Sequence, residues 1–124
     1  MGTASGQRAA NTDVLTVRYM VGDGLTIATS VPPTSTAPVN LPSAAVGAPL
    51  NFANGDLALI SDCNSSQVFA TTPTGSTLTH TLADGNYIPT LTGITPYKRE
   101  NDARVFNFTK NFVSVTYFIG FHDD

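Results

Sequence analysis

The chain has 124 residues, a formal net charge of −3 and only six basic residues, so it lacks the basic excess typical of nucleic-acid binding modules. Charged residues make up 12% of the sequence, about half the usual share, and eighteen threonines take their place. Ten glycines, eight prolines and 41% apolar residues favour a folded chain of strands and turns over a helical or disordered one. No run of about 18 apolar residues occurs, so no membrane-spanning helix is predicted.

The N-terminal part of the sequence predicts a flexible start followed by a hairpin. Residues 1–12 are rich in Gly, Ser, Ala and Thr and are expected to form a flexible linker. In residues 13–21 the apolar side chains recur at alternate positions, which predicts a strand. Gly22-Asp23-Gly24 is a hairpin turn signal, so residues 25–31 are expected to return beside that strand.

A long proline-rich loop is predicted over residues 32–49, because proline cannot donate a hydrogen bond to a sheet ladder. Loops of this length are often functional, which makes this one a candidate interaction loop. Its five prolines are Pro32, Pro33, Pro38, Pro42 and Pro49. The alternative is an ordinary surface crossing between two sheets.

The most patterned stretch of the chain covers residues 54–69. Asn54-Gly55 is a turn dipeptide, and the apolar run Leu57–Ile60 predicts a short strand covered on both faces. A polar cluster over Ser61–Ser66 follows, before Val68-Phe69 opens a second apolar strand. The expected arrangement is therefore strand, tight connection, strand.

The polar cluster contains the only cysteine of the chain, Cys63, directly after Asp62. A single cysteine cannot form a disulfide within the chain. The neighbouring carboxylate disfavours the thiolate form, so Cys63 is not expected to be a nucleophile. Asp62 is expected to cap the turn by accepting hydrogen bonds from backbone N–H groups two or three residues ahead.

The rest of the sequence predicts further short strands joined by turns. Two strands are expected at residues 67–72 and 76–82, on either side of a turn at Pro73-Thr74-Gly75. Residues 104–118 alternate in polarity and predict a second hairpin, which turns at Lys110-Asn111.

These segments together predict an all-β fold with antiparallel strands in one or two packed sheets. The seven Phe and four Tyr side chains mostly fall at alternating strand positions and are expected to pack in the core. No segment has a helical period. The predicted organisation is a single β domain over residues 13–120, with a frayed end at residues 121–124.

Candidates for catalysis and metal binding are few. His80 and His122 are the only histidines, and no His-x-x-x-His or Cys-x-x-Cys pair occurs, so no metal site and no cofactor are predicted. No Gly-x-Ser-x-Gly elbow is present, and no catalytic residue is assigned. His80 alternates with threonines and is expected at the surface or half-buried. A hydrolase is an alternative that would need a Ser or Cys nucleophile beside His80.

A Gly-Asp pair, an apolar strand, an Asp-Cys pair and a Phe in the next strand occur in this order, at Gly55, Asp56, Asp62, Cys63 and Phe69. This order resembles the PilW-type minor pilins of bacterial type IV pili. Thr12–Tyr19 is similar to that family's first strand, and Tyr117–Gly120 to its later Tyr-aromatic-Ile strand. The three segments follow the family's order and span most of the chain.

The resemblance implies a structural, non-enzymatic role. Such a protein is expected to help initiate pilus assembly and to lie in or near the fibre tip, packed against other minor pilins and the major pilin. It is expected in the periplasm or the surface pilus, and to reach the inner membrane only through an N-terminal helix that this sequence does not contain. The chain would then be the central β portion of a longer protein, and Cys63 could pair with a cysteine outside it.

A different class of function is an extracellular adhesin or carbohydrate-binding β-sandwich module. Its candidate contacts are the proline-rich loop and the side chains of Tyr87 and Tyr97. Glycan binding that is lost when either tyrosine is changed would favour this alternative.

Overall fold

The computed structural model describes residues 4–32, 36–42, 52–91, 97–98 and 102–121. Contacts divide the chain into two compact units, Met1–Val21 with Phe112–Asp124, here called the ribbon unit, and Gly22–Asn111, here called the sheet unit. Each unit is described by itself. The single domain expected over residues 13–120 stays a prediction, because contacts within each unit do not determine whether the two unfold together.

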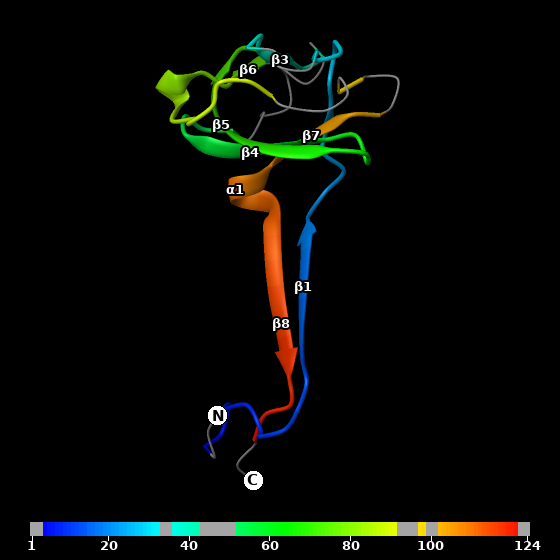
Figure 1. Ribbon diagram of the computed structural model, residues 1–124, viewed down its shortest axis with the longest axis vertical. Helices are drawn as coiled ribbons and strands as arrows, with labels where there is room; N and C mark the ends of the chain where they lie inside the picture. Colours follow the sequence, from blue (N-terminus) through cyan, green and yellow to red (C-terminus); the bar gives the residue numbers. More distant parts are fainter. Residues whose placement is uncertain (1–3, 33–35, 43–51, 92–96, 99–101, 122–124) are drawn as a thin grey trace. The chain divides into compact units, whose positions relative to one another are not determined.

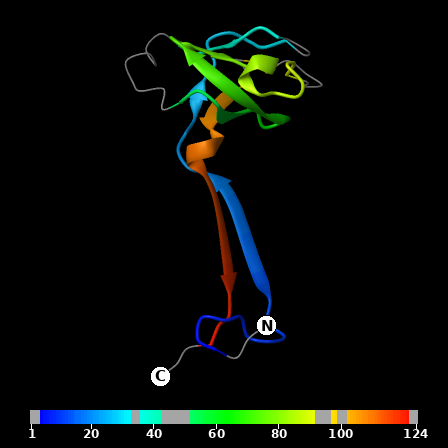
Figure 2. The ribbon, with the colours of Figure 1, turned by 90° about the vertical axis from the view of Figure 1, so that its left-hand side faces the viewer.

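The ribbon unit is a two-stranded antiparallel sheet of β1 (Val14–Met20) and β8 (Phe112–Phe118). All seven residues of each strand are paired in one continuous register. Figures 1 and 2 show the two strands side by side along their length. Isolated bridges at Ser5 and Arg8, within the segment predicted to be a flexible linker, pair with residues that follow β8.

This pairing differs from the predicted hairpins. Residues 25–31 do not return beside β1, because β2 (Leu25–Thr26) pairs with β7 (Arg104–Asn107) in the sheet unit. β8 pairs with β1 instead of β7, so the hairpin predicted around Lys110-Asn111 is also wrong. Both residues lie in α1 (Phe108–Asn111), a single helical turn that separates β7 from β8.

The sheet unit adds four strands and one 3-10 helix to β2, β7 and α1: β3 (Val39–Asn40), β4 (Asp56–Ser61), β5 (Ser66–Thr74), β6 (Thr77–Thr79) and η2 (Leu82–Asp84). The strand order is β2-β7-β4-β5-β6-β3, and every pairing is antiparallel (Figure 1). β5 pairs with β4 along residues 66–71 and with β6 along residues 72–74. The predicted all-β fold with antiparallel strands is confirmed, and of the one or two sheets expected the structure has two.

Burial alternates along β4, so only one face of this strand contributes to the core. Ala58 and Ile60 are fully buried, whereas Leu57 is 38% exposed and Leu59 is half-buried. The prediction that the run Leu57–Ile60 is covered on both faces is therefore wrong. The core of the sheet unit consists of these two residues and ten further buried side chains, Ile27, Val31, Val39, Leu41, Phe69, Leu78, Leu91, Tyr97, Ala103 and Val105.

The predicted boundaries around β5 and β6 also change. Pro73 and Thr74 belong to β5 and pair with β6, so the turn is limited to Gly75-Ser76. The strand predicted over residues 76–82 is limited to β6, because Leu82 opens η2 and is 62% exposed.

The aromatic side chains are distributed differently from the prediction. Of the seven Phe and four Tyr expected mostly in the core, only Phe69 and Tyr97 are buried. Six others are exposed: Tyr19, Tyr87, Phe112, Tyr117, Phe118 and Phe121. Five of these six belong to the ribbon unit. Sequence alternation places these side chains on strand faces, but it does not determine whether a second layer covers the face.

Candidate functional site

The central motif folds as a capped turn between β4 and β5. Asp62 is buried, and its Oδ1 accepts hydrogen bonds from the backbone N–H groups of Asn64 at 3.1 Å and Ser65 at 2.9 Å. These groups are two and three residues ahead, so the predicted cap is confirmed. The turn holds Cys63 at a φ of 67°, in the left-handed region where residues other than glycine are uncommon.

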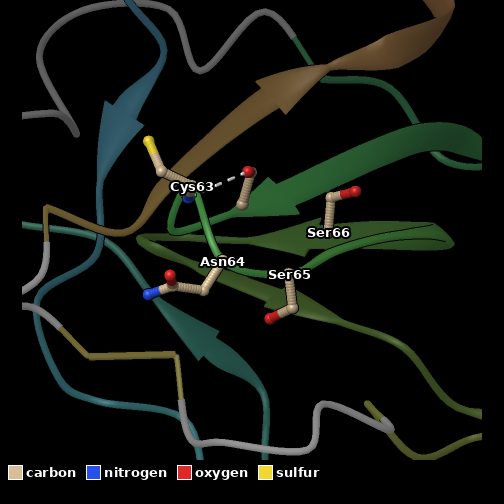
Figure 3. A pocket seen from close by; sticks show the side chains of 5 residues that line it. Cys63, Asn64, Ser65 and Ser66 are labelled. Carbon is tan, nitrogen blue, oxygen red and sulfur yellow. Dashed lines mark hydrogen bonds between the residues drawn. The ribbon is translucent and has the colours of Figure 1, made fainter.

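Cys63 is exposed with a free thiol, beside an open polar pocket of about 220 Å³. The pocket is lined by small polar side chains of the turn, Ser61, Cys63, Asn64, Ser65 and Ser66. The thiol points away from the side chains of Asn64, Ser65 and Ser66 (Figure 3). These hydroxyl and amide groups can bind a polar ligand but supply no general base, so this lining does not form a catalytic arrangement.

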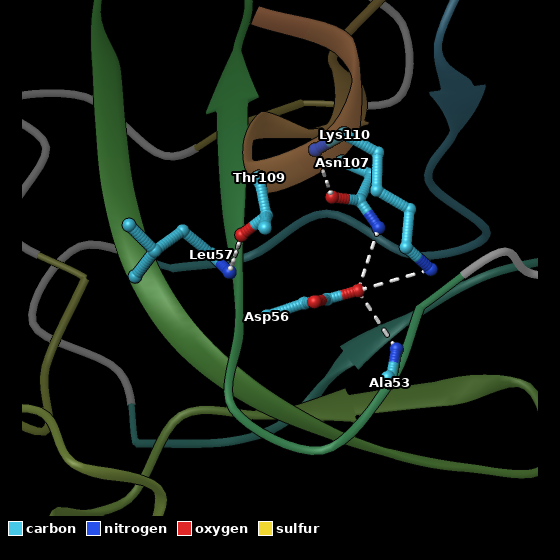
Figure 4. A network of polar contacts seen from close by, with 6 residues as sticks. All are labelled: Ala53, Asp56, Leu57, Asn107, Thr109 and Lys110. Carbon is cyan, nitrogen blue, oxygen red and sulfur yellow. Dashed lines mark hydrogen bonds and ion pairs between the residues drawn. The ribbon is translucent and has the colours of Figure 1, made fainter.

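Asp56 forms a second polar site at the start of β4. Its Oδ2 accepts hydrogen bonds from the Ala53 N–H at 2.8 Å and from Asn107 Nδ2 at 2.9 Å, and forms an ion pair with Lys110 Nζ at 3.3 Å (Figure 4). The hydrogen bond from Ala53 is the main cause that lowers the pKa of Asp56 below 3.8; burial opposes it, and Asn107 and Lys110 add to it. The carboxylate therefore joins the turn before β4 to the end of β7 and to α1.

Asn107 is the residue of this network that the sequence does not single out. Its Oδ1 accepts a hydrogen bond from the Lys110 N–H at 3.0 Å, which caps the first turn of α1. In the same turn, Thr109 Oγ1 accepts a hydrogen bond from the Leu57 N–H at 2.7 Å (Figure 4). The only sequence signal for this cap is an Asn ahead of Phe-Thr-Lys. The alternating polarity of the surrounding residues predicts a strand, so this signal does not by itself predict a helical turn.

His80 is buried, at 2% exposure, so its predicted place at the surface or half-buried is wrong. Its Nδ1 lies 2.9 Å from the carbonyl oxygen of Pro89, and its Nε2 lies 2.7 Å from that of Ala37. The Phe69 ring makes a T-shaped contact with the imidazole, with the ring centroids 5.5 Å apart. Because carbonyl oxygens occupy both nitrogens, the ring is not placed to take a proton from a nucleophile such as Cys63.

The candidate interaction loop is partly described. Pro32 and Pro38 are exposed and Pro42 is half-buried, whereas Pro33 and Pro49 lie outside the described residues. The loop is interrupted by β3, which is at the edge of the sheet unit and pairs with β6.

The two tyrosines assigned to the adhesin alternative have opposite environments. Tyr87 is 96% exposed and is free to contact a partner. Tyr97 is 2% exposed, and burial raises the pKa of its hydroxyl. The proposed ligand contact at Tyr97 is therefore wrong, because its ring lies in the core.

The ribbon unit exposes one face made only of apolar side chains. Leu15, Val17 and Tyr19 of β1 pair with Tyr117, Val115 and Val113 of β8, and alternate residues of a strand share a face. These six residues are here called the apolar ribbon face. None of them is buried: Leu15 and Tyr117 are 62% and 60% exposed. The opposite face is mixed, because Thr16, Arg18, Ser114 and Thr116 lie on it.

An open hollow of about 470 Å³ lies at one end of the ribbon unit. Five of its lining side chains are apolar or aromatic and one is a carboxylate: Asp13, Val14, Leu15, Tyr117, Phe118 and Ile119. This hollow extends the exposed apolar surface beyond the paired strands.

No family model matches the chain, and comparisons with curated proteins and with solved structures give no significant match. In the part of the chain that the structure describes, no group of three or more His, Cys, Asp or Glu residues could hold a metal ion. No helix among those same residues is long and apolar enough to cross a membrane.

Proposed function

We propose that this protein is a non-enzymatic minor pilin component, which helps to initiate type IV pilus assembly and lies in or near the fibre tip. Its partners are other minor pilins and the major pilin, in the periplasm and in the surface pilus. The observation that carries the proposal is the apolar ribbon face, a surface suited to packing against another subunit. Exposed contiguous apolar surfaces of this kind mark interaction sites in proteins.

The two-stranded form of the ribbon unit is itself a reason to expect a partner. A two-stranded antiparallel sheet is marginally stable in water, and a third strand or a covering layer is needed to stabilise it. The segments that resemble minor pilins overlap both strands of the ribbon unit: Thr12–Tyr19 covers most of β1, and Tyr117–Gly120 begins with the last two residues of β8. The pairing of β1 with β8 thus brings together two segments that are about a hundred residues apart in the sequence.

The chemistry of the sheet unit supports a structural role over catalysis. The pocket beside Cys63 contains no histidine or carboxylate in its lining. Both nitrogens of His80 face carbonyl oxygens, and the Asp56 carboxylate is occupied by three donors. None of these groups is arranged as a nucleophile with its base.

The test is a substitution on each face of the ribbon, made in the full-length protein of a piliated host. Val17→Lys places a charge on the apolar ribbon face, and Thr16→Lys places the same charge on the mixed face. We expect Val17→Lys to remove surface pili, counted by electron microscopy, at an unchanged protein level. Thr16→Lys should retain the pili. Normal piliation with Val17→Lys would contradict the assembly role of this face.

An extracellular adhesin is the second candidate, and the exposure of Tyr87 favours it. An exposed aromatic ring can stack on an apolar sugar face or pack against a protein receptor. Glycan-array binding by the protein that disappears with Tyr87→Ala and persists with Tyr19→Ala would support this function over the assembly role.

A further inference from the structure

The chain contains two Asn-x-Ser/Thr motifs, the sequence at which sugars are attached to asparagine in secreted proteins. The first is Asn64-Ser65-Ser66, in the turn between β4 and β5, and the second is Asn107-Phe108-Thr109, where β7 meets α1. A three-residue motif also occurs by chance, so the motif alone assigns no site. The fold decides which copy can be modified, through the environment of the asparagine amide and of the hydroxyl group two residues after it.

The first motif leaves both of these groups available. Asn64 and Ser66 are exposed and line the open polar pocket beside the turn (Figure 3). With the residues that the structure describes, neither the Asn64 amide nor the Ser66 hydroxyl forms a hydrogen bond. The turn is held instead by Asp62, whose Oδ1 binds the backbone N–H groups of Asn64 and Ser65. A substituent on the Asn64 side chain therefore breaks none of the hydrogen bonds that hold the turn.

The second motif has both groups occupied. Asn107 is 4% exposed; its Nδ2 donates to Asp56 Oδ2 at 2.9 Å, and its Oδ1 accepts from the Lys110 N–H at 3.0 Å. Thr109 Oγ1 accepts a hydrogen bond from the Leu57 N–H at 2.7 Å. A close-packed interior has no room for a sugar on Nδ2, and the substituent would break the contact with Asp56. The folded chain therefore excludes modification at Asn107.

We propose that Asn64 is an acceptor for N-linked glycosylation and that the fold protects Asn107 from it. In the transfer, Asn64 Nδ2 attacks the anomeric carbon of a sugar that is linked to a lipid pyrophosphate. The bond from Nδ2 to this carbon forms while the bond from the carbon to the pyrophosphate oxygen breaks, and the electron pair of the broken bond stays on the oxygen. Nδ2 gives one proton to a base of the transferring enzyme and keeps the other, and the lipid pyrophosphate leaves.

A glycan at Asn64 is bulky and hydrophilic, so it keeps the turn between β4 and β5 in solvent and out of subunit packing. Neither motif lies in β1 or β8, so the apolar ribbon face carries no acceptor. The inference rests on the extracytoplasmic location in the proposed function, because asparagine-linked sugars are a modification of secreted proteins.

The test uses the purified, folded chain with a purified oligosaccharyltransferase and a lipid-pyrophosphate-linked sugar. An unstructured acceptor peptide in the same reaction shows that the enzyme is active. Intact mass is measured before and after digestion with peptide N-glycosidase, which removes the sugar and leaves an aspartate that peptide mapping locates. We expect one glycan, at Asn64, and none at Asn107. Cellular location does not enter this reaction, so its outcome is separate from that of the piliation test.

Two matched variants separate the two motifs. Ser66→Ala removes the hydroxyl group of the first motif and should abolish the transfer, whereas Thr109→Ala removes that of the second motif and should leave the transfer unchanged. A folded chain that stays bare at Asn64 while the control peptide is glycosylated would overturn the proposal. Sugar on Asn107 in the folded chain, or transfer that depends on Thr109 instead of Ser66, would overturn it as well.

Discussion

The Asp56 carboxylate should be a principal polar contributor to the stability of the sheet unit. One oxygen, Oδ2, binds the Ala53 N–H, Asn107 Nδ2 and Lys110 Nζ. In Asp56→Ala all three donors lose this acceptor. Asn107 is 4% exposed, so water cannot readily replace the carboxylate at its amide.

The magnitude follows from the three contacts. A hydrogen bond to a charged group contributes about 1.5 kcal/mol at the lower end of the measured range, so Ala53 and Asn107 together account for about 3 kcal/mol. The Lys110 side chain is 38% exposed, and an ion pair of that exposure adds about 0.5 kcal/mol. With a urea m-value of about 2 kcal/mol per molar, Asp56→Ala should lower the unfolding midpoint by about 1.8 M.

The assay is equilibrium urea unfolding followed by tyrosine fluorescence, to which the buried Tyr97 contributes, and by circular dichroism. Lys110→Met is the matched control, because it removes the exposed ion pair and leaves the hydrogen bonds of Asp56 with Ala53 and Asn107; the loss of the ion pair should shift the midpoint by about 0.3 M. A shift in Asp56→Ala as small as that of Lys110→Met would refute the assignment of the stability to the two buried hydrogen bonds.

The same contact predicts a pH dependence with a defined sign. The Ala53 hydrogen bond, with smaller contributions from Asn107 and Lys110, holds the pKa of Asp56 below its ordinary value of 3.8. For a carboxyl group whose folded pKa is lowered, the stabilisation is present above the unfolded pKa and is lost as the pH falls through the folded pKa. The difference between wild type and Asp56→Ala should therefore be constant near neutral pH and shrink below pH 3.8.

Two further substitutions test the backbone of the sheet unit. Gly24→Ala places a Cβ 2.7 Å from Phe106 Cε1 at a φ of 67°, so it should lower the unfolding free energy by about 3 kcal/mol. The control is Gly55→Ala, at a φ of 83° and with no atom within 4 Å of the added Cβ, which should lower the unfolding free energy by about 1.5 kcal/mol. Equal urea midpoints for the two variants would show that the Phe106 ring moves aside freely. Asn86→Ala removes the side-chain amide that binds both the N–H (2.8 Å) and the C=O (2.7 Å) of Ala70. This loss should lower the free energy of unfolding by about 2 kcal/mol and expose the Ala70 amide to hydrogen exchange. Unchanged exchange at the Ala70 amide would contradict this pairing.

The features that the sequence predicts correctly depend on neighbours within a few residues. The Asn54-Gly55 turn requires a residue with positive φ at its second position, and Gly55 has a φ of 83°. The Asp62 cap binds donors two and three residues ahead. The residues that form each of these two interactions lie within five positions of one another, so the local sequence is sufficient to predict both.

One group of failed predictions concerns strand partners. A Gly-Asp-Gly turn allows a hairpin, but it does not decide whether the flanking strands pair with each other or with strands further along the chain. β1 pairs with β8 instead, and β2 pairs with β7. The alternation of residues 104–118 is equally misleading, because the Asn107 cap inserts one helical turn between two strands that belong to different sheets.

Burial of polar groups is the property least visible in the sequence. His80, directly after β6, and Asn107, the last residue of β7, occupy positions that suit an exposed residue as well as a buried one, and only partners distant in the sequence decide between the two. Ala37 lies 43 residues from His80, and Asp56 lies 51 residues from Asn107. A lone histidine or asparagine in a strand therefore gives no prediction of burial without the strand order.

The two units differ in which groups they leave without a partner, and this difference supports the contact surface proposed above. In the sheet unit the buried polar side chains of Asp56, His80 and Asn107 all find partners within the unit; the exception is Asp62 Oδ2, which has no hydrogen-bond partner among the described residues. In the ribbon unit the reverse holds, because six apolar side chains share a face on which none is buried. Covering apolar surface is favourable by about 25 cal/mol per Å², whereas the capped turn at Cys63 has already satisfied its backbone donors. A partner of the kind proposed above would therefore gain more free energy at the apolar ribbon face than at the motif over residues 54–69.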